Sequence, residues 1–206
     1  MKTKVTIVGA GPAGSLLSKV LHDAGIDNIV LEARSRDYVL ERIRAGVLEQ
    51  GSVELLRAAG VGANMDRDGL PHDGSAIVWE GKKDFFIDTR RFANSRLMAY
   101  GQANIQADLY EALEAQGHSP VFEADNVQLH AIESDHPYVT YRHGGEERRI
   151  DCEFIAGCDG FHGVSRPAIP SNILRNYEKV YPFGWLGIMS RTPPVPHITY
   201  ANHPRG

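Results

Sequence analysis

The feature that most constrains this chain is a glycine-rich turn near its start. An apolar run at residues 5–10 leads into glycines at positions 9, 11 and 14, the spacing G-x-G-x-x-G. Apolar residues then recur at helical spacing, at Ala13, Leu16, Leu17, Val20, Leu21 and Ala24. This order predicts a strand, a tight turn and a helix whose apolar stripe lies on a sheet.

Each glycine has its own role in such a turn. Gly9 permits the turn, Gly11 lets a pyrophosphate approach the backbone, and Gly14 lets the helix pack closely on the strand. The start of the helix offers free N–H groups and the positive end of the helix dipole, which favour an anion. Glu32 follows the next apolar run, at 29–31, and can accept hydrogen bonds from both hydroxyls of a ribose. The joint pattern predicts a dinucleotide site and leaves the choice between FAD and NAD(P) open.

Composition argues against several other classes of protein. The chain has 206 residues, 42% hydrophobic and 23% charged, as in ordinary globular proteins. Its net charge of −4, without a basic block, argues against nucleic acid or an anionic membrane as the main partner. With no membrane-length apolar run and no signal peptide, we expect a cytoplasmic protein. Cys152 and Cys158 lack the spacing of a disulfide framework or a metal site, and we expect both in the core.

The first half of the chain predicts mixed structure after Glu32. Residues 33–38 read as a polar loop, in which Arg34 and Arg36 either contact phosphate or are solvated. A second loop, at 41–47, precedes a helix with Leu48, Leu55, Leu56 and Ala59 on one face, closed by Gly60. His72 lies in a predicted turn, where a solvated histidine and a catalytic one are both open readings. Residues 75–80 and 82–88 form a predicted hairpin across Glu80-Gly-Lys.

The second half predicts a helix, a meander and a return strand. The helix begins at 100–102, has Ile105, Leu109, Ala112 and Leu113 facing inward, and ends at Gly117. An antiparallel meander covers 121–141 with a turn at Gly144 and Gly145. An apolar strand at 149–157 then leads to the Cys-Asp-Gly sequence at 158–160. The remainder is rich in proline and aromatic residues, and it ends without a predicted helix or strand.

Motifs spread over the whole chain carry a family resemblance. In addition to the glycine turn with Glu32, the motifs are RIRAGVLEQ at 42–50, YGQ at 100–102, CDGFHGVSR at 158–166, YPFGW at 181–185 and YANHPRG at 200–206. Together they make the chain resemble the single-component flavin aromatic hydroxylases, in particular those acting on 4-hydroxybenzoate. The resemblance implies FAD as bound cofactor and NADPH as co-substrate. NADH is the alternative, because Ala33 stands where NADPH-preferring members carry a basic residue.

The resemblance also implies roles for single residues. FAD contacts are implied for Gly9, Gly11, Gly14, Glu32, Arg42, Arg44, Gln102 and Asp159, and the loop of Ala45, Gly46 and Val47 flanks the isoalloxazine. His162, Arg44 and Arg166 match contacts to NADPH. Tyr200 and His72 match the inner and outer members of a relay that removes the phenol proton. No metal is implied. As an alternative, Asp159 caps the following segment and His162 has no role in chemistry.

The implied fold is α/β, or α+β overall. It is a Rossmann-like three-layer FAD-binding domain with an antiparallel sheet from a second, substrate domain. We expect residues 1–71 and 98–180 in the first domain, and residues 72–97 and 181–206 at the start of the second.

The implied reaction converts 4-hydroxybenzoate and O₂ to 3,4-dihydroxybenzoate through a flavin C4a-hydroperoxide, in a homodimer of the full-length protein. Because family chains are longer, the 206-residue chain is expected to be incomplete, inactive and weak in binding FAD. A related hydroxylase for another phenolic acid and a non-catalytic nucleotide-binding module are the alternatives.

Overall fold

The computed structural model describes residues 1–80, 82–188 and 190–205, without the side chains of Lys83 and Asp84. The chain forms two compact units, each built from two stretches of sequence. The first contains Met1–Leu70 and Met98–Ile169, and the second contains Pro71–Leu97 and Pro170–Gly206. The assignment of these units to a FAD domain and a substrate domain stays a prediction.

Three parallel strands form the centre of the first unit. Their order is β11-β1-β2, with β1 at Val5–Val8, β2 at Asn28–Leu31 and β11 at Phe154–Gly157. The register places Ile7 beside Val30 and Ala156, and places Thr6 beside Ile29 and Ile155. Because side chains alternate along a strand, these two rows face opposite sides of the sheet.

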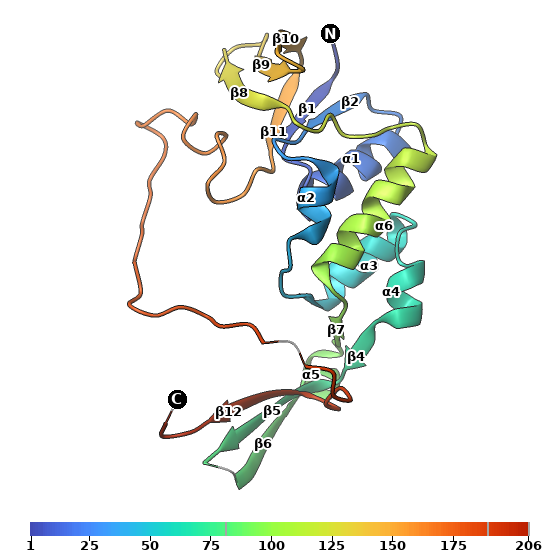
Figure 1. The fold of residues 1–206 in the computed structure, drawn as a ribbon, viewed down its shortest axis with the longest axis vertical. Coiled ribbons are helices and arrows are strands. Elements are labelled where there is room, and N and C mark those ends of the chain that lie inside the picture. The colour runs from blue at the N-terminus through green and yellow to red at the C-terminus, as the bar shows by residue number, and fades with distance from the viewer. Residues whose placement is uncertain (81, 189, 206) are drawn as a thin grey trace. The chain divides into compact units, whose positions relative to one another are not determined.

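Helices cover one face of this sheet. Helices α1 (Pro12–Asp23) and α6 (Gln102–Ala115) lie side by side (Figure 1). The row of Ile7 and Val30 packs against them in one core cluster with Tyr110 of α6. Three shorter helices complete this part of the unit, α2 (Arg36–Glu41), α3 (Gln50–Ala58) and α4 (Ala63–Asp68).

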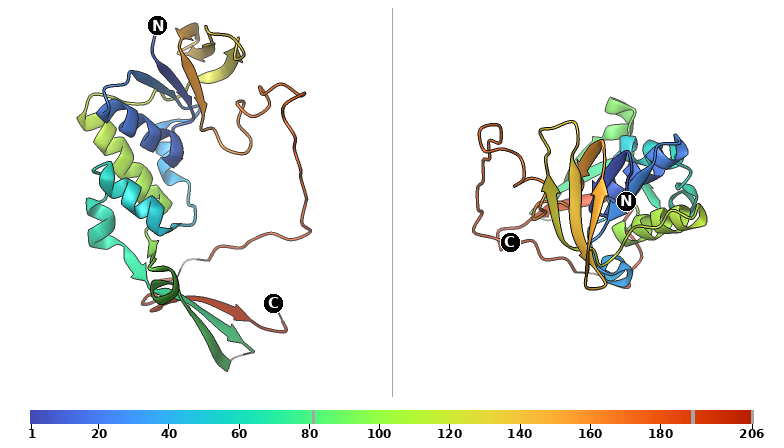
Figure 2. Two further views of the ribbon diagram at one scale, coloured as in Figure 1. Left: turned by 180° about the vertical axis from the view of Figure 1, so that it is seen from behind. Right: turned by 90° about the horizontal axis from the view of Figure 1, so that it is seen from above.

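An antiparallel sheet covers the other face. Its strands are β8 (Asp125–His130), β9 (Tyr138–His143) and β10 (Glu146–Asp151), in the order β10-β9-β8. Leu31 of β2 and Val139 of β9 share a fully buried cluster with Ile150 of β10. Figure 2 shows this sheet on the side of the parallel sheet away from α1 and α6. The three layers confirm the expected α/β fold. The expected meander is confirmed at β8 and β9 with the turn before β10, whereas Val121, predicted as its first segment, forms an isolated parallel bridge with Leu31.

The second unit contains a three-stranded sheet in the order β12-β5-β6. The predicted hairpin is β5 (Gly74–Trp79) paired with β6 (Lys82–Asp88), and Gly81 of its predicted turn lies outside the described residues. Helix α5 (Thr89–Ala93) follows β6. Strand β12 (Ile198–Asn202), which the sequence did not predict, pairs in parallel with β5.

Two further short strands carry the chain between the units, β4 (Leu70–His72) and β7 (Leu97–Ala99). Residues Met98 and Ala99 of β7 pair with β3 (Val47–Leu48). No helix among the described residues has the length and apolar character needed to cross a membrane.

The buried face of α1 differs from the predicted stripe. The stripe residues Ala13, Val20 and Ala24 are exposed, and Leu16, Leu17 and Leu21 are only partly buried. The buried residues of α1 are Gly14, Ser15, Ser18 and Lys19. A Cβ at Gly14 would lie 1.9 Å from the carbonyl oxygen of Gly9, so α1 approaches the turn too closely for large side chains. Ser15 and Ser18, whose hydroxyls are hydrogen-bonded, occupy this face beside Gly14, and Lys19 further along pairs with Asp23.

Three other sequence predictions are also wrong. The polar loop at 33–38 becomes helix α2 from Arg36, since the Ser35 hydroxyl accepts a hydrogen bond from the Tyr38 N–H and caps it. On α3, Leu55 is exposed and Val53 is buried. The single strand at 149–157 is two strands, because Cys152 bonds to Pro137 at the antiparallel sheet while the next residues bond to β1. Cys152 is buried as expected, and Cys158 is half-buried.

Candidate functional site

A cavity of about 610 Å³ lies at the N-terminal end of α1, where the glycine turn leaves β1. Its walls come from the turn, the end of β2, the loop after α2, the start of α6 and the segment after β11. It brings together the following predicted cofactor residues: Gly9, Gly11, Glu32, Arg42, Arg44, Gln102, Asp159 and His162. Residues from five separate stretches of sequence therefore meet where the pattern predicted a dinucleotide.

The three glycines of the turn differ in what surrounds them. Gly9 has φ +98°, and a Cβ there would lie 2.6 Å from the Cys158 carbonyl oxygen. At Gly14 the space is tighter still, because a Cβ would lie 1.9 Å from the Gly9 carbonyl oxygen. A Cβ at Gly11 would meet nothing within 4 Å. Packing therefore requires Gly9 and Gly14, whereas Gly11 leaves open space on the cavity side.

Glu32 ties the turn to the loop after β2. One of its carboxylate oxygens accepts a hydrogen bond from the Ala10 N–H (2.9 Å), and the other accepts one from the Arg34 N–H (3.0 Å). A carboxylate oxygen has a second lone pair, so these bonds leave acceptor capacity for a ribose hydroxyl. Arg34 lines the cavity, whereas Arg36 is paired with Glu114 (3.0 Å) and does not line it.

The positive wall of the cavity comes from the loop between α2 and β3. Arg42 and Arg44 both line the cavity, and neither forms an ion pair within the described residues. A guanidinium can bind phosphate oxygens through two parallel N–H groups. The two arginines therefore offer charge that the protein's own carboxylates do not neutralise.

The small residues Ala45 and Gly46 and the following Val47 do not line this cavity. Gly46 instead packs on the segment leading into α6: the Tyr100 N–H donates to the Gly46 carbonyl oxygen (2.8 Å), and a Cβ at Gly46 would lie 2.2 Å from the Tyr100 carbonyl oxygen. Close backbone packing thus requires glycine here. The expected role of Ala45, Gly46 and Val47 beside the isoalloxazine stays a prediction.

Replacing Gly46 with alanine is expected to push the 42–47 loop away from Tyr100. We expect the free energy of unfolding to fall by about 1–3 kcal/mol, as for other overpacked sites, and FAD affinity to fall with it because Arg42 and Arg44 move. Chemical denaturation and flavin titration measure the two effects. The matched substitution Gly51→Ala, where a Cβ meets nothing within 4 Å, lies in helix α3 and should leave FAD affinity unchanged without lowering the free energy of unfolding. Equal behaviour of the two variants would contradict the packing argument.

Asp159 performs the capping role that the sequence left as an alternative. One of its carboxylate oxygens accepts a hydrogen bond from the Ser165 N–H (2.8 Å). The residue also lines the cavity, so capping does not exclude a contact with a ligand. His162 lines the same cavity, and its ring packs edge-on against Phe161 (4.9 Å between centroids).

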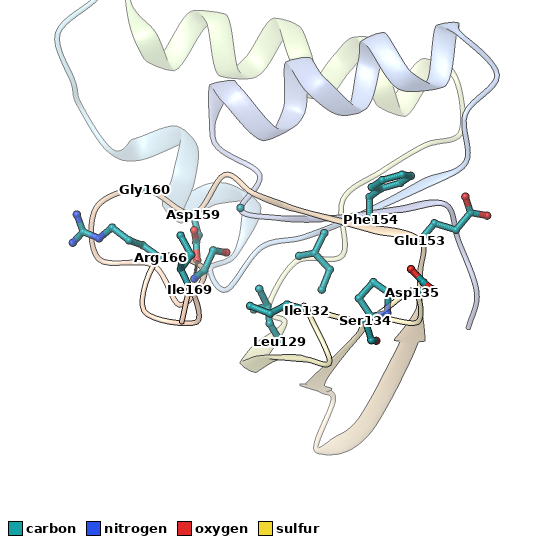
Figure 3. Close-up of a pocket in the computed structure, with 14 residues that line it drawn as sticks. Leu129, Ile132, Ser134, Asp135, Glu153, Phe154, Asp159, Gly160, Arg166 and Ile169 are labelled. Atoms are coloured by element: carbon teal, nitrogen blue, oxygen red, sulfur yellow. Dashed lines mark hydrogen bonds between the residues drawn. The ribbon is translucent and has the colours of Figure 1, made fainter. Parts of the chain in front are cut away.

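Arg166 does not join the other predicted residues. Its guanidinium donates to the Phe161 carbonyl oxygen (3.1 Å) and lies over the Phe161 ring. It lines a second cavity, of about 880 Å³, formed along β11 (Figure 3). Asp159 and Gly160 line both cavities. The predicted NADPH contacts are thus divided, with Arg44 and His162 at the first cavity and Arg166 at the second.

His72 and Tyr200, the predicted proton relay, both belong to the second unit. His72 is not in a solvated turn: it ends β4, is 6% exposed, and its Nδ1 lies 3.3 Å from the Pro196 carbonyl oxygen. Tyr200 lies in β12 and is 64% exposed. No hydrogen bond joins the two side chains within the described residues. The relay stays a prediction.

Three side chains at the turn were missed by the sequence analysis, Ser15, Gln106 and Tyr110. All three are buried polar residues whose side chains reach the backbone of the turn. A signal was present, because Gln106 and Tyr110 lie four residues apart beside the apolar stripe of α6. Polar residues on a buried helix face need partners, and here the partner is the glycine turn.

Burial shifts the acidity of two groups near the cavity. It raises the pKa of the Tyr110 phenol above its usual value, and the negative charge of Glu32 adds to the effect. It also raises the pKa of the Cys158 thiol, with a further contribution from Asp159. Tyr110 therefore remains a hydrogen-bond donor, and Cys158 remains a neutral thiol. Among the described residues, no three His, Cys, Asp or Glu side chains are grouped so as to hold a metal ion.

The residues of the first cavity fit the FAD that the resemblance implies. Open space beside Gly11 admits a pyrophosphate, Arg42 and Arg44 supply charge for it, and Glu32 has acceptor capacity for a ribose. In addition, Gln106 lines the cavity with a buried side-chain oxygen that has no partner within the described residues. The donor and acceptor set thus suits a nucleotide with two phosphates.

Comparison with known sequences supports the resemblance. Residues 2–206 match the family model described as FAD binding domain. The chain is 46% identical over 208 aligned residues to p-hydroxybenzoate hydroxylase from Acinetobacter baylyi, covering 100% of this chain and 51% of that protein. It is 26% identical over 166 residues to 3-(3-hydroxy-phenyl)propionate/3-hydroxycinnamic acid hydroxylase 2 from Burkholderia vietnamiensis, covering 77% and 30%. The chain thus spans about half the length, or less, of these curated relatives.

Comparison with solved structures supports the fold. A probable FAD-dependent monooxygenase from Pseudomonas aeruginosa superposes with a TM-score of 0.72 at 19% identity, covering 88% of this chain and 48% of that one. The p-nitrophenol 4-monooxygenase of Pseudomonas putida gives a TM-score of 0.69 at 18% identity, covering 80% and 43%. With a family match over nearly every residue and a cavity that fits the cofactor, the chain belongs to the family of FAD-binding domains.

Proposed function

We propose that the full-length protein is an FAD-dependent aromatic hydroxylase that converts 4-hydroxybenzoate to 3,4-dihydroxybenzoate. The overall reaction consumes NADPH, a proton and O₂, and releases NADP⁺ and water with the hydroxylated product. NADH is the alternative co-substrate, and a homodimer is the proposed assembly. The observation that carries the proposal is the cavity in which residues of five separate segments meet at the glycine turn. The 46% identity to a p-hydroxybenzoate hydroxylase supports the choice of substrate.

In the proposed site, the turn and its neighbours hold the cofactor. The backbone at Gly9, Gly11 and Gly14 approaches the pyrophosphate, and Glu32 accepts hydrogen bonds from the adenosine ribose. Arg42 and Arg44 neutralise phosphate charge, while Gln102 and Asp159 contact the flavin side. Bound FAD supplies the redox chemistry that takes electrons from NADPH and transfers one oxygen atom from O₂.

The protein's own residues must prepare the substrate for this transfer. Attack on the ring carbon ortho to the hydroxyl needs an electron-rich ring, and a phenolate is far richer than a phenol. We propose that the Tyr200 oxygen accepts the phenol proton as Tyr200 gives up its own hydroxyl proton, and that His72 receives the released proton and passes it to solvent, because histidine as a residue type changes charge near neutral pH.

The test is substrate-dependent NADPH oxidation by the full-length, FAD-loaded protein. We expect 4-hydroxybenzoate to stimulate NADPH oxidation and to yield 3,4-dihydroxybenzoate, identified by chromatography. Stimulation only by other phenolic acids, such as 3-(3-hydroxyphenyl)propionate, would instead indicate a related hydroxylase. Bound FAD without stimulation by any phenol would leave a non-catalytic nucleotide-binding module.

A further inference from the structure

Three buried side chains donate hydrogen bonds to one backbone carbonyl in the glycine turn. The Ala10 carbonyl oxygen accepts from the Ser15 hydroxyl (2.9 Å), the Gln106 amide (3.1 Å) and the Tyr110 hydroxyl (2.8 Å). The Gln106 amide also donates to the Ser15 hydroxyl oxygen (3.1 Å). The donors come from α1 and α6, so both helices hold the same peptide group.

Fixing this carbonyl also fixes the N–H of the next residue. The Ala10–Gly11 peptide is planar and trans, so its C=O and N–H point in opposite directions. The carbonyl points at side chains that are 0–2% exposed. The Gly11 N–H therefore points away from them, and it has no acceptor within the described residues. Gly11 lines the cavity and has open space beside it.

The donors exceed what stability alone requires. A carbonyl oxygen has two lone pairs, and the Ser15 and Gln106 donors already satisfy it. A third donor, from Tyr110, adds little to the satisfaction of the carbonyl but restricts its direction. The Glu32 carboxylate holds the other side of the same residue through the Ala10 N–H. Ala10 is thus fixed from both sides.

We propose that Ser15, Gln106 and Tyr110 are positioning residues for the cofactor: by fixing the Ala10 carbonyl they aim the Gly11 N–H at the FAD pyrophosphate. The inference rests on the proposed placement of the pyrophosphate at this turn. None of the three side chains needs to touch the cofactor for this effect. They act through one peptide group, and their loss should weaken binding of every ligand that carries a pyrophosphate at this position.

The test is Tyr110→Phe, which removes one hydroxyl and keeps the buried ring. We expect flavin-free protein carrying this change to bind both FAD and ADP about tenfold more weakly, the equivalent of one well-aligned hydrogen bond. The ³¹P resonances of the bound FAD pyrophosphate should shift, because the N–H facing the phosphate changes direction. Ser15→Ala should give the same two results independently if Tyr110→Phe does not fold.

Ser18→Ala is the matched control. Ser18 is also fully buried on α1, and its hydroxyl donates to the Asn28 side chain (2.7 Å), away from the turn. The Ser18→Ala variant should lower the free energy of unfolding much as Ser15→Ala does, while leaving FAD affinity and the ³¹P resonances unchanged.

Two results would overturn the inference. One is that Tyr110→Phe and Ser15→Ala both retain FAD affinity and the ³¹P resonances. The other is that Ser18→Ala alters them equally. Gly11→Val tests the placement of the pyrophosphate separately. If this variant retains FAD, the pyrophosphate does not lie at this turn, and both the placement and the positioning role fail. If Gly11→Val loses FAD while Tyr110→Phe and Ser15→Ala bind normally, only the positioning role fails.

Discussion

Replacing Gly11 with valine is expected to weaken FAD binding at least about 100-fold while the protein stays folded. A Cβ at Gly11 meets no heavy atom within 4 Å, so the new side chain begins in open space and extends into the place proposed for the pyrophosphate. Gly11 has φ −67°, which valine can adopt. We expect the free energy of unfolding to change by no more than about 1 kcal/mol, the range of an N-cap substitution. Flavin titration and chemical denaturation give the two numbers.

Gly14→Val is the contrasting variant. Its Cβ would lie 1.9 Å from the Gly9 carbonyl oxygen, which is backbone and cannot move aside cheaply. This change should cost several kcal/mol of stability and prevent recovery of folded protein. If Gly11→Val purified with full flavin content, or if it unfolded as readily as Gly14→Val, the separation of roles between the two glycines would be wrong.

Replacing His72 with asparagine is expected to slow hydroxylation about 100-fold near neutral pH, because the proton-transfer step loses its proposed carrier. Asparagine can still donate to the Pro196 carbonyl oxygen that His72 contacts, so packing should be kept. It cannot titrate. The loss should shrink as pH rises, because a larger share of the phenol then ionises without help. Single-turnover rates measured across pH, with FAD and substrate affinities as references, test this expectation.

His197→Asn serves as the control, since it removes a histidine of the same unit that has no proposed role in the relay. Its rates should match the unmodified protein at every pH. A pH profile of His72→Asn that is unchanged from the unmodified protein would show that His72 is a buried structural residue at the end of β4.

The parts of the site that depend on local backbone were predictable from sequence. Gly9, Gly11 and Glu32 meet as expected because a strand, a tight turn and a helix fix their spacing along the chain. Only the resemblance placed Arg42, Gln102 and Asp159 in the site. Their local sequence patterns do not predict that three distant segments converge.

What the sequence did not predict depends on tertiary contacts. The apolar stripe of α1 was right only in part: Leu16, Leu17 and Leu21 pack against the core clusters, but the close approach at Gly14 places small residues at the most buried positions. Ser15 has the character of a surface residue, and only its contact with the Ala10 carbonyl oxygen explains its burial. The burial of His72 depends on residue 196, far along the chain. Arg166 matched a family contact, yet its guanidinium bonds to the Phe161 carbonyl oxygen and the residue lines the other cavity.

The pairing of β1 with β11 has a consequence for how the chain folds. Val5 pairs with Phe154, and between them lie all the helices of the first unit and the hairpin of the second. Closing so long a loop is slow, because its entropy is lost before the new contacts form. During synthesis the edge of β1 that pairs with β11 therefore stays unpaired until residue 157 has left the ribosome. Over that interval the edge is open to strands of other molecules, and substitutions that delay β11 should reduce the yield of folded protein more than its final stability.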